Sequence, residues 1–229
     1  MDDSPEDFLR ALTGGEAPAP AINDGRPLVY SACVGSNADQ FPGILDLYVP
    51  EGAKVADVTY GRGVFWRNVP EGRVTLLATD LQTGTDFRSL PYEDGSIDAL
   101  VLDPPYMHTP GGTAHRGHQS YEAAYQNNAT TAPEGTKYHE AVLALYLQGI
   151  AEAHRVLRPK GVLILKGQDE VCAGKQRLTH VELIAGTADR FIVEDYFVTV
   201  SVNRPGVSRM VRQLHARKNH SWWLVLRRK

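Results

Sequence analysis

An apolar run that ends in two prolines constrains this chain more than any other stretch. Residues 97–102 read Ile-Asp-Ala-Leu-Val-Leu, which is typical of a strand buried on both faces of a parallel sheet. Asp103, Pro104, Pro105 and Tyr106 follow directly. Because proline donates no backbone hydrogen bond and fixes its own φ, the strand must end there. Ligands bind at the carboxyl ends of strands in open α/β sheets, so this turn is a candidate site.

The rest of the chain predicts one α/β domain over residues 31–229. The 229 residues are enough for one domain with a full core. Residues 1–30 carry six acids, two bases and a proline-rich stretch, which predicts a flexible acidic segment. Strand-like runs near 54–58, 74–78, 162–165, 191–200 and 222–226 alternate with helical patterns at 36–48, 138–157 and 178–188. That alternation predicts a mostly parallel sheet.

Composition argues against several classes of protein. The net charge of −3 does not suit a uniformly basic nucleic-acid coat, although residues 201–229 carry eight bases and no acid. Cys33 and Cys172 lie far apart, so neither a disulfide framework nor a cysteine-based zinc site is expected. His115 and His118 have no nearby cysteine, and a solvated loop is favoured there over a metal site. With no membrane-spanning run and no signal peptide visible, we expect a cytoplasmic protein.

A glycine turn follows one of the predicted strands. Asp57 is followed by Thr-Tyr-Gly-Arg-Gly at residues 59–63 and then by Val-Phe-Trp at residues 64–66. A dinucleotide-binding turn has a third glycine three residues past the second, where this chain has Trp66. The turn therefore disfavours NAD or FAD, and the absence of a Gly-Lys-Ser/Thr sequence in it gives no support for a P-loop.

These two turns resemble motifs of a known family. The turn from Asp57 to Gly63 resembles motif I of class I S-adenosylmethionine-dependent methyltransferases. The Asp103–Tyr106 turn resembles the DPPY motif of DNA amino-methyltransferases, and Lys166–Asp169 and Gln213–Ser221 extend the resemblance to small phage- and bacterial-type enzymes over residues 36–228. It implies a Rossmann-like class I methyltransferase fold, α/β, with a mostly parallel seven-stranded sheet, an antiparallel last strand and helices on both faces.

The resemblance implies S-adenosyl-L-methionine as the cofactor. The glycine turn would pass beneath its amino-acid end, Asp80 would bind the ribose hydroxyls, and Asp86 with Phe87 would lie beside its adenine. A carboxylate suits a ribose because it accepts hydrogen bonds from both hydroxyls. The alternative role for Asp80 is that of a strand-end turn residue. The implied cofactor-binding residues are Asp57, Thr59, Tyr60, Gly61, Gly63, Phe65, Asp80, Leu81, Asp86 and Phe87.

The DPPY resemblance also implies the reaction. An aromatic amino group is a poor nucleophile because its lone pair is delocalised into the ring. The Asp103 carboxylate and a backbone carbonyl near Pro104 would accept its two hydrogens and aim the lone pair at the methyl donor. Tyr106 would stack on a base flipped out of the duplex. Asp103, Pro104, Pro105 and Tyr106 are thus the implied catalytic residues of an N6-adenine DNA methyltransferase.

The implied partner is duplex DNA with its target base flipped out. Arg217, Lys218, Asn219 and His220 form a basic loop that we predict to contact DNA, and a hairpin turn with surface charge is the alternative. Because the chain has no long insertion for target recognition, specificity would come from short loops, a homodimer or a separate partner. N4-cytosine, an RNA base and a protein amide are alternative substrates. A catalytically inactive nucleic-acid-binding module would be expected to have a broken glycine turn or a replaced Asp103.

Overall fold

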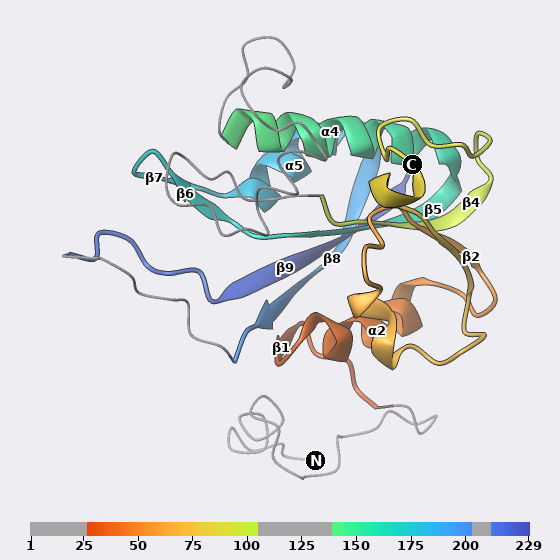
Figure 1. Cartoon of the computed structure of the whole chain (residues 1–229), viewed down its shortest axis with the longest axis horizontal. Coiled ribbons are helices and arrows are strands. Elements are labelled where there is room, and N and C mark those ends of the chain that lie inside the picture. The colour runs from red at the N-terminus through yellow and green to blue at the C-terminus, as the bar shows by residue number, and fades with distance from the viewer. Residues whose placement is uncertain (1–26, 105–138, 203–211) are drawn as a thin grey trace.

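A seven-stranded sheet organises the chain, with helices on both faces and a separate two-stranded hairpin (Figure 1). The computed structural model describes residues 27–104, 139–202 and 212–229. The sheet strands are β1 (Ala32–Val34), β2 (Lys54–Asp57), β3 (Thr75–Ala78), β4 (Ile97–Leu102), β5 (Leu157–Gly167), β8 (Phe191–Val200) and β9 (His220–Arg228). The hairpin is β6 (Glu170–Cys172) and β7 (Lys175–Arg177), and the helical elements are α2 (Asn37–Tyr48), α4 (His139–Val156), α5 (Thr179–Thr187), η1 (Val64–Asn68) and η2 (Leu81–Thr83).

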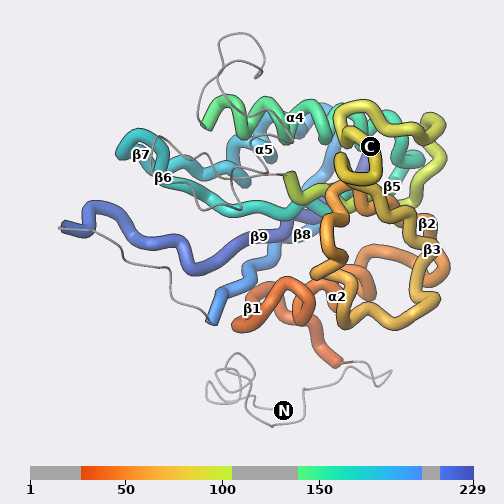
Figure 2. The backbone as a smooth tube through the Cα atoms, in the orientation of Figure 1, coloured from red at the N-terminus to blue at the C-terminus, as the bar shows by residue number. Residues whose placement is uncertain are grey.

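The strand order is β1-β8-β9-β5-β4-β2-β3. All pairings in this sheet are parallel except those of β9, which runs antiparallel to both β5 and β8. Figure 2 shows β9 beside β8. The prediction of a Rossmann-like, mostly parallel sheet with an antiparallel last strand is confirmed, and β9 lies inside the sheet. From β2, the chain adds β3 on one side and β4 on the other. In open α/β sheets, such a switch in direction opens a crevice at the carboxyl ends of the strands.

Two cores form because side chains of each central strand alternate between the faces of the sheet. Leu100 and Leu102 of β4 belong to the core beneath α4 and α5. Ala99 and Val101 belong to the core beneath α2. Figure 1 shows α4 and α5 on one face and α2 on the other. At this central position both faces are covered, which explains why β4 is apolar almost throughout.

The three predicted helices and four of the six predicted strands match the observed segments closely. Two expectations differ at their ends. The strand expected at 162–165 extends over Leu157–Gly167, and β9 begins at His220 and so shortens the loop expected at 213–221. β1 and the β6–β7 hairpin were not predicted. The flexible acidic segment predicted over residues 1–30 falls almost entirely outside the described residues.

Candidate active site

Asp57, Asp103 and Lys166 lie at the carboxyl ends of β2, β4 and β5, on both sides of the switch point. Asp57 pairs with Val101 and Leu102 pairs with Leu165, so Asp103 and Lys166 immediately follow paired residues of neighbouring strands. By the alternation of the strands, all three side chains are on the α2 face of the sheet. The structure thus brings two acids and a lysine together where a parallel sheet offers a ligand site.

Asp103 has an unsatisfied acceptor. Its Oδ1 is buried and has no hydrogen-bond partner among the described residues. Burial raises the pKa of Asp103 to about 6, although the positive charge of Lys166 opposes this rise. The backbone N–H of Asp103 donates to Thr59 Oγ1 at 2.8 Å. The next residue, Pro104, is buried, whereas Pro105 and Tyr106 lie outside the described residues; their roles stay predictions.

Lys166 lies at the end of the strand beside Asp103, where the sequence predicts it, and its burial is what the sequence does not disclose. The lysine is 1 % exposed, and within the described ranges its Nζ has no hydrogen-bond partner. Burial lowers the pKa of Lys166 to about 8, while Asp103 opposes this fall. The Nζ lies 5.1 Å from the centre of the Trp223 ring. A buried lysine without a hydrogen bond is rare and costly; the signal in the sequence is that it directly follows the apolar run 162–165.

The glycine turn after β2 needs glycine for two reasons. Gly61 and Gly63 have φ of 53° and 61°, in the left-handed region that side chains disfavour. A Cβ on Gly63 would also lie 2.4 Å from the Tyr60 hydroxyl oxygen. At Gly61 a Cβ would meet only the Thr59 carbonyl, at 3.9 Å, so the backbone there is open to a ligand. The turn then enters η1 at Val64.

Asp57 anchors this turn. Its Oδ2 accepts a 2.7 Å hydrogen bond from Trp66 Nε1, and its Oδ1 accepts one of 3.1 Å from the Thr59 N–H. The residue is 1 % exposed, and burial raises the pKa of Asp57 to about 7. Trp66, which stands in the place of the third glycine of a dinucleotide-binding turn, therefore has a structural partner in Asp57.

Asp80 also holds the turn in place. Its Oδ1 accepts from the N–H groups of Gln82 and Thr83 at 2.7 and 3.0 Å, and its Oδ2 accepts from the Gly61 N–H at 2.9 Å. A carboxylate offers about four acceptor positions, so about one is left. A ribose diol would have to displace one of these donors or share with it. The turn role considered for Asp80 is present in the structure, and ribose binding stays a prediction.

The remaining predicted cofactor residues are engaged within the fold. Arg88 donates to Asp86 at 2.7 Å, and this contact holds the pKa of Asp86 below its usual range. Phe87 is 1 % exposed in the α4-side core. Leu81 is partly buried against the same core, and Phe65 packs on the opposite one, with its ring centre 4.8 Å from that of Trp223. Their cofactor contacts stay predictions, and a base could reach the Phe87 ring only after a rearrangement.

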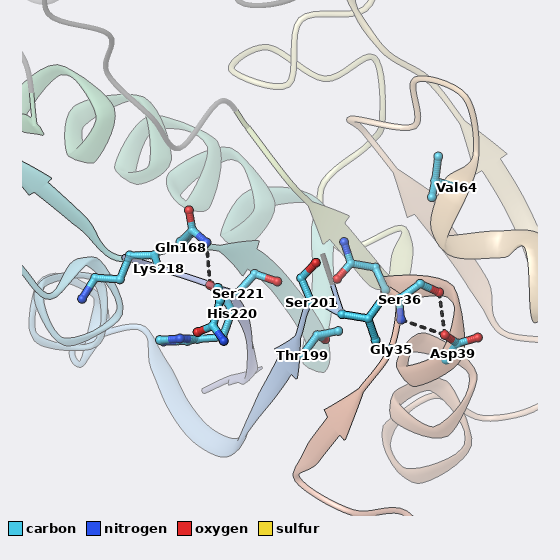
Figure 3. A pocket seen from close by; sticks show the side chains of 13 residues that line it. Gly35, Ser36, Asp39, Val64, Gln168, Thr199, Ser201, Lys218, His220 and Ser221 are labelled. Carbon is cyan, nitrogen blue, oxygen red and sulfur yellow. Dashed lines mark hydrogen bonds between the residues drawn. The ribbon is translucent and has the colours of Figure 1, made fainter. Parts of the chain in front are cut away.

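Three residues of the predicted DNA-binding loop line a cavity of about 650 Å³ (Figure 3). Such a volume is typical of sites for small ligands. The cavity is walled by the loop, the start of α2, and the ends of β5 and β8; its lining includes Ser36, Asp39, Gln168, Thr199, Lys218, Asn219 and His220. The predicted loop residues thus face a concave surface next to the strand ends.

Hydrogen bonds hold this loop against its neighbours. Lys218 Nζ donates to Gln176 Oε1 of the hairpin at 2.7 Å, and Gln168 Nε2 donates to the His220 carbonyl at 2.5 Å. The Asn219 side chain is exposed, and so is Arg217, which does not line the cavity. The structure therefore separates Arg217 from the other three, and contact of any of them with DNA stays a prediction.

Neither a metal-binding cluster nor a membrane-spanning helix is present in the described parts of the chain. No group of three or more His, Cys, Asp or Glu side chains there could hold a metal ion. His115 and His118 fall outside those parts. No helix among the described residues has both the length and the apolar character needed to cross a membrane.

Comparisons with known proteins gave matches among solved structures alone. No family model and no curated protein matches the sequence. An S-adenosylmethionine-dependent methyltransferase from Methanosarcina mazei is 12 % identical with a TM-score of 0.43, over 80 % of this chain and 96 % of that one. TrmN from Thermus thermophilus is 16 % identical with a TM-score of 0.45, over 84 % of this chain and 49 % of that one. A putative DNA modification methylase from the same organism, complexed with S-adenosyl-L-methionine, is 16 % identical with a TM-score of 0.38, over 76 % of this chain and 55 % of that one. The chain thus spans most of the first protein and about half of the other two.

Proposed function

We propose that this chain is an S-adenosyl-L-methionine-dependent methyltransferase that modifies the exocyclic amino group of a nucleic-acid base, with N6 of adenine in DNA as the leading substrate. The observation that carries the proposal is the buried Oδ1 of Asp103, which has no hydrogen-bond partner among the described residues and lies at the switch point of the sheet, directly before a proline. A buried acceptor without a donor costs about 1–3 kcal/mol. Such a cost is typical of a functional site, where a ligand supplies the missing donor.

The glycine turn fits the cofactor. The open backbone at Gly61 leaves room for a ligand beside the end of β2, and the turn of Thr59–Gly63 would hold the amino-acid end. S-adenosyl-L-methionine supplies a methyl group on a positively charged sulfur. Asp57 and Asp80 contribute by fixing the turn, since both already accept hydrogen bonds from it. Thr59 links this turn to Asp103, so the two parts of the site are held in one geometry.

The protein's part in the reaction is orientation of the amino group. Asp103 Oδ1 would accept one amino hydrogen, and a backbone carbonyl at the Pro104 turn the other. Both bonds would draw the nitrogen toward a pyramidal shape and point its lone pair at the methyl group. The nitrogen–methyl bond would form as the sulfur–methyl bond breaks, which leaves S-adenosyl-L-homocysteine, and the amino group would lose one of its protons. A hydrogen bond to an ionised carboxylate is stronger than a neutral one, and fixed acceptors need no rearrangement during the reaction.

DNA and adenine are the finer parts of the proposal. The DPPY resemblance favours adenine over cytosine. The cavity next to the basic loop, which Asp103 does not line, offers a concave surface for the backbone that adjoins the flipped base. An inactive binding module is disfavoured by the intact glycine turn and by the presence of Asp103. An RNA base or N4 of cytosine would use the same two acceptors.

Methyl transfer from labelled cofactor tests the proposal. The purified chain is incubated with methyl-labelled S-adenosyl-L-methionine and unmethylated genomic DNA, with A·T-only and G·C-only duplexes, and with RNA. Mass spectrometry of the hydrolysed product is expected to show N6-methyladenine. Label in N4-methylcytosine or in RNA would support the proposed reaction but contradict adenine in DNA as its substrate. Absence of label in every nucleic acid, with a folded protein, would contradict the proposal.

A further inference from the structure

Lys166 and Asp103 offer a complementary pair of unsatisfied groups. One is a buried donor and the other a buried acceptor, and neither has a hydrogen-bond partner among the described residues. They follow the paired residues Leu165 and Leu102 on neighbouring strands, which lie about 4.7–4.9 Å apart. Both are on the α2 face of the sheet. The charge of each also opposes the effect of burial on the pKa of the other, so one small flat group could contact both.

The described part of the fold gives Lys166 no hydrogen-bond partner. Its neighbour on β9 is Trp223, and the five β5 residues directly before it, 161–165, are buried. The lysine and Asp103 do not hydrogen-bond to each other, so the lysine is not simply the other half of a closed ion pair. A buried ammonium group without a hydrogen bond is costly, and an apolar side chain would fill this position without that cost. A ligand that accepts from Nζ explains why a lysine stands there.

We propose, on the basis of the function proposed above, that Lys166 Nζ donates a hydrogen bond to the ring nitrogen next to the methylated amino group. That nitrogen is N1 of adenine, or N3 if the base is cytosine. Asp103 Oδ1 then accepts a hydrogen bond from the amino group itself. The two residues together therefore bind a base that has a hydrogen-bond donor, its amino group, next to an acceptor, its ring nitrogen. Thymine and uracil present the reverse order, an acceptor beside a ring N–H, and cannot satisfy either residue. Lys166 thereby selects the base and fixes the rotation of its ring.

The test removes the acceptor from the base and the donor from the protein in turn. Target positions are first mapped in methylated DNA, and duplexes are then made with 1-deazaadenine at the target, or 3-deazacytosine if cytosine is modified. We expect the wild-type single-turnover rate to fall about tenfold or more on the deaza base, the effect of losing one specific base contact. Lys166→Met should be slow on the natural base and should show no further loss on the deaza base. Duplexes with 7-deazaadenine are the matched control, and their rate ratio should be the same in both proteins.

Further measurements distinguish this role of Lys166 from cofactor binding and from a role as the counter-ion of Asp103. An equal deaza effect in wild type and Lys166→Met would overturn the proposal. Loss of calorimetric cofactor affinity in Lys166→Met, with the deaza effect unchanged, would assign the lysine to the cofactor and overturn it too. Full recovery of Lys166→Met at alkaline pH would make the lysine only a counter-ion of Asp103, with the same consequence. Lys54→Met, an exposed lysine at the opposite end of β2, should behave as wild type throughout.

Misfolding of the variant, failure of the proposed function and failure of the role of Lys166 each give a different result. Thermal unfolding of Lys166→Met reports whether the variant folds, and Lys166→Arg, which keeps charge and donors, should retain part of the deaza effect. A wild-type protein that methylates no base contradicts the proposed function. A wild-type protein that methylates adenine without regard to N1 contradicts the role of Lys166 alone.

Discussion

The backbone N–H of Asp103 donates a 2.8 Å hydrogen bond to Oγ1 of Thr59, 44 residues earlier in the chain. The Thr59 N–H in turn donates to Oδ1 of Asp57. One threonine therefore connects the turn after β4, which carries the proposed reacting acid, with the glycine turn after β2. The distance between the methyl donor and its acceptor would depend on this connection.

Replacing Thr59 tests the connection. In Thr59→Val the Asp103 N–H loses its acceptor, so the free energy of unfolding should fall by about 1 kcal/mol. Methyl transfer should slow by about tenfold, because small misplacements of reacting groups are costly. Thr59→Ser keeps the hydroxyl and should stay close to wild type in both urea unfolding and single-turnover rate. Equal rates for the valine and serine variants would contradict this role.

A pair of glycines separates backbone strain from the shape of the turn. Gly63 and Gly52 both have a left-handed φ, of 61° and 71°, but a Cβ has a close contact only at Gly63, with Tyr60. Both alanine variants should lose about 1 kcal/mol of stability from strain. Gly63→Ala should additionally weaken cofactor binding in calorimetry, and Gly52→Ala should not. Similar affinities in the two variants would remove the glycine turn from the proposed cofactor site.

Asp57 makes stability depend on pH in a direction opposite to that of most acids. Burial raises its folded pKa to about 7, against about 3.9 in an unfolded chain. The folded state thus holds its proton more tightly, and the resulting stability is fully present below about pH 3.9 and is lost as pH rises through about 7. In urea unfolding over this range, the stability of wild type relative to Asp57→Asn should fall with rising pH. A constant difference would show that Asp57 titrates normally.

His139 predicts a second loss of stability at higher pH. It is 1 % exposed, and its Nδ1 and Nε2 lie 2.8 and 3.1 Å from oxygens of Glu170 and Glu182. Burial alone would lower the pKa of His139, but the two glutamates raise it overall. Its stabilising contribution is fully present below about pH 6.5 and is lost as pH rises through the folded pKa. The difference in Tm between wild type and His139→Gln should therefore shrink toward alkaline pH; a difference that grows would contradict the pairing.

Much of the fold could be predicted because it depends on long apolar patterns. The run ending at Leu102 and the helical spacing of residues 138–157 were sufficient to place β4 and α4. β1 has three residues, too few for any periodicity, and it forms by pairing with β8. The β6–β7 hairpin is also short and mostly polar. The available signal in the sequence was Gly174 at its turn, where both Ala173 and Gly174 have positive φ in the structure.

The site could be predicted only as far as strand ends reveal it. Asp57, Asp80 and Asp103 were expected at one edge of the sheet because each closes a strand. Which of them is satisfied could not be predicted, since that depends on contacts with residues distant in sequence: Asp57 with Trp66, Asp80 with Gly61, and Asp103 Oδ1 with no described residue. The burial of Lys166 likewise depends on β9, which reaches β5 from the end of the chain.

The most direct test of the account measures methyl transfer and cofactor binding in Asp103→Ala. If Asp103 orients the amino group, single-turnover transfer to DNA should fall by about a thousandfold or more, as when a principal electrostatic contact is removed. Calorimetric affinity for S-adenosyl-L-methionine should stay close to that of wild type and of Asp46→Ala, an exposed acid on α2. Transfer that persists in Asp103→Ala, or cofactor binding that is lost together with it, would contradict the account.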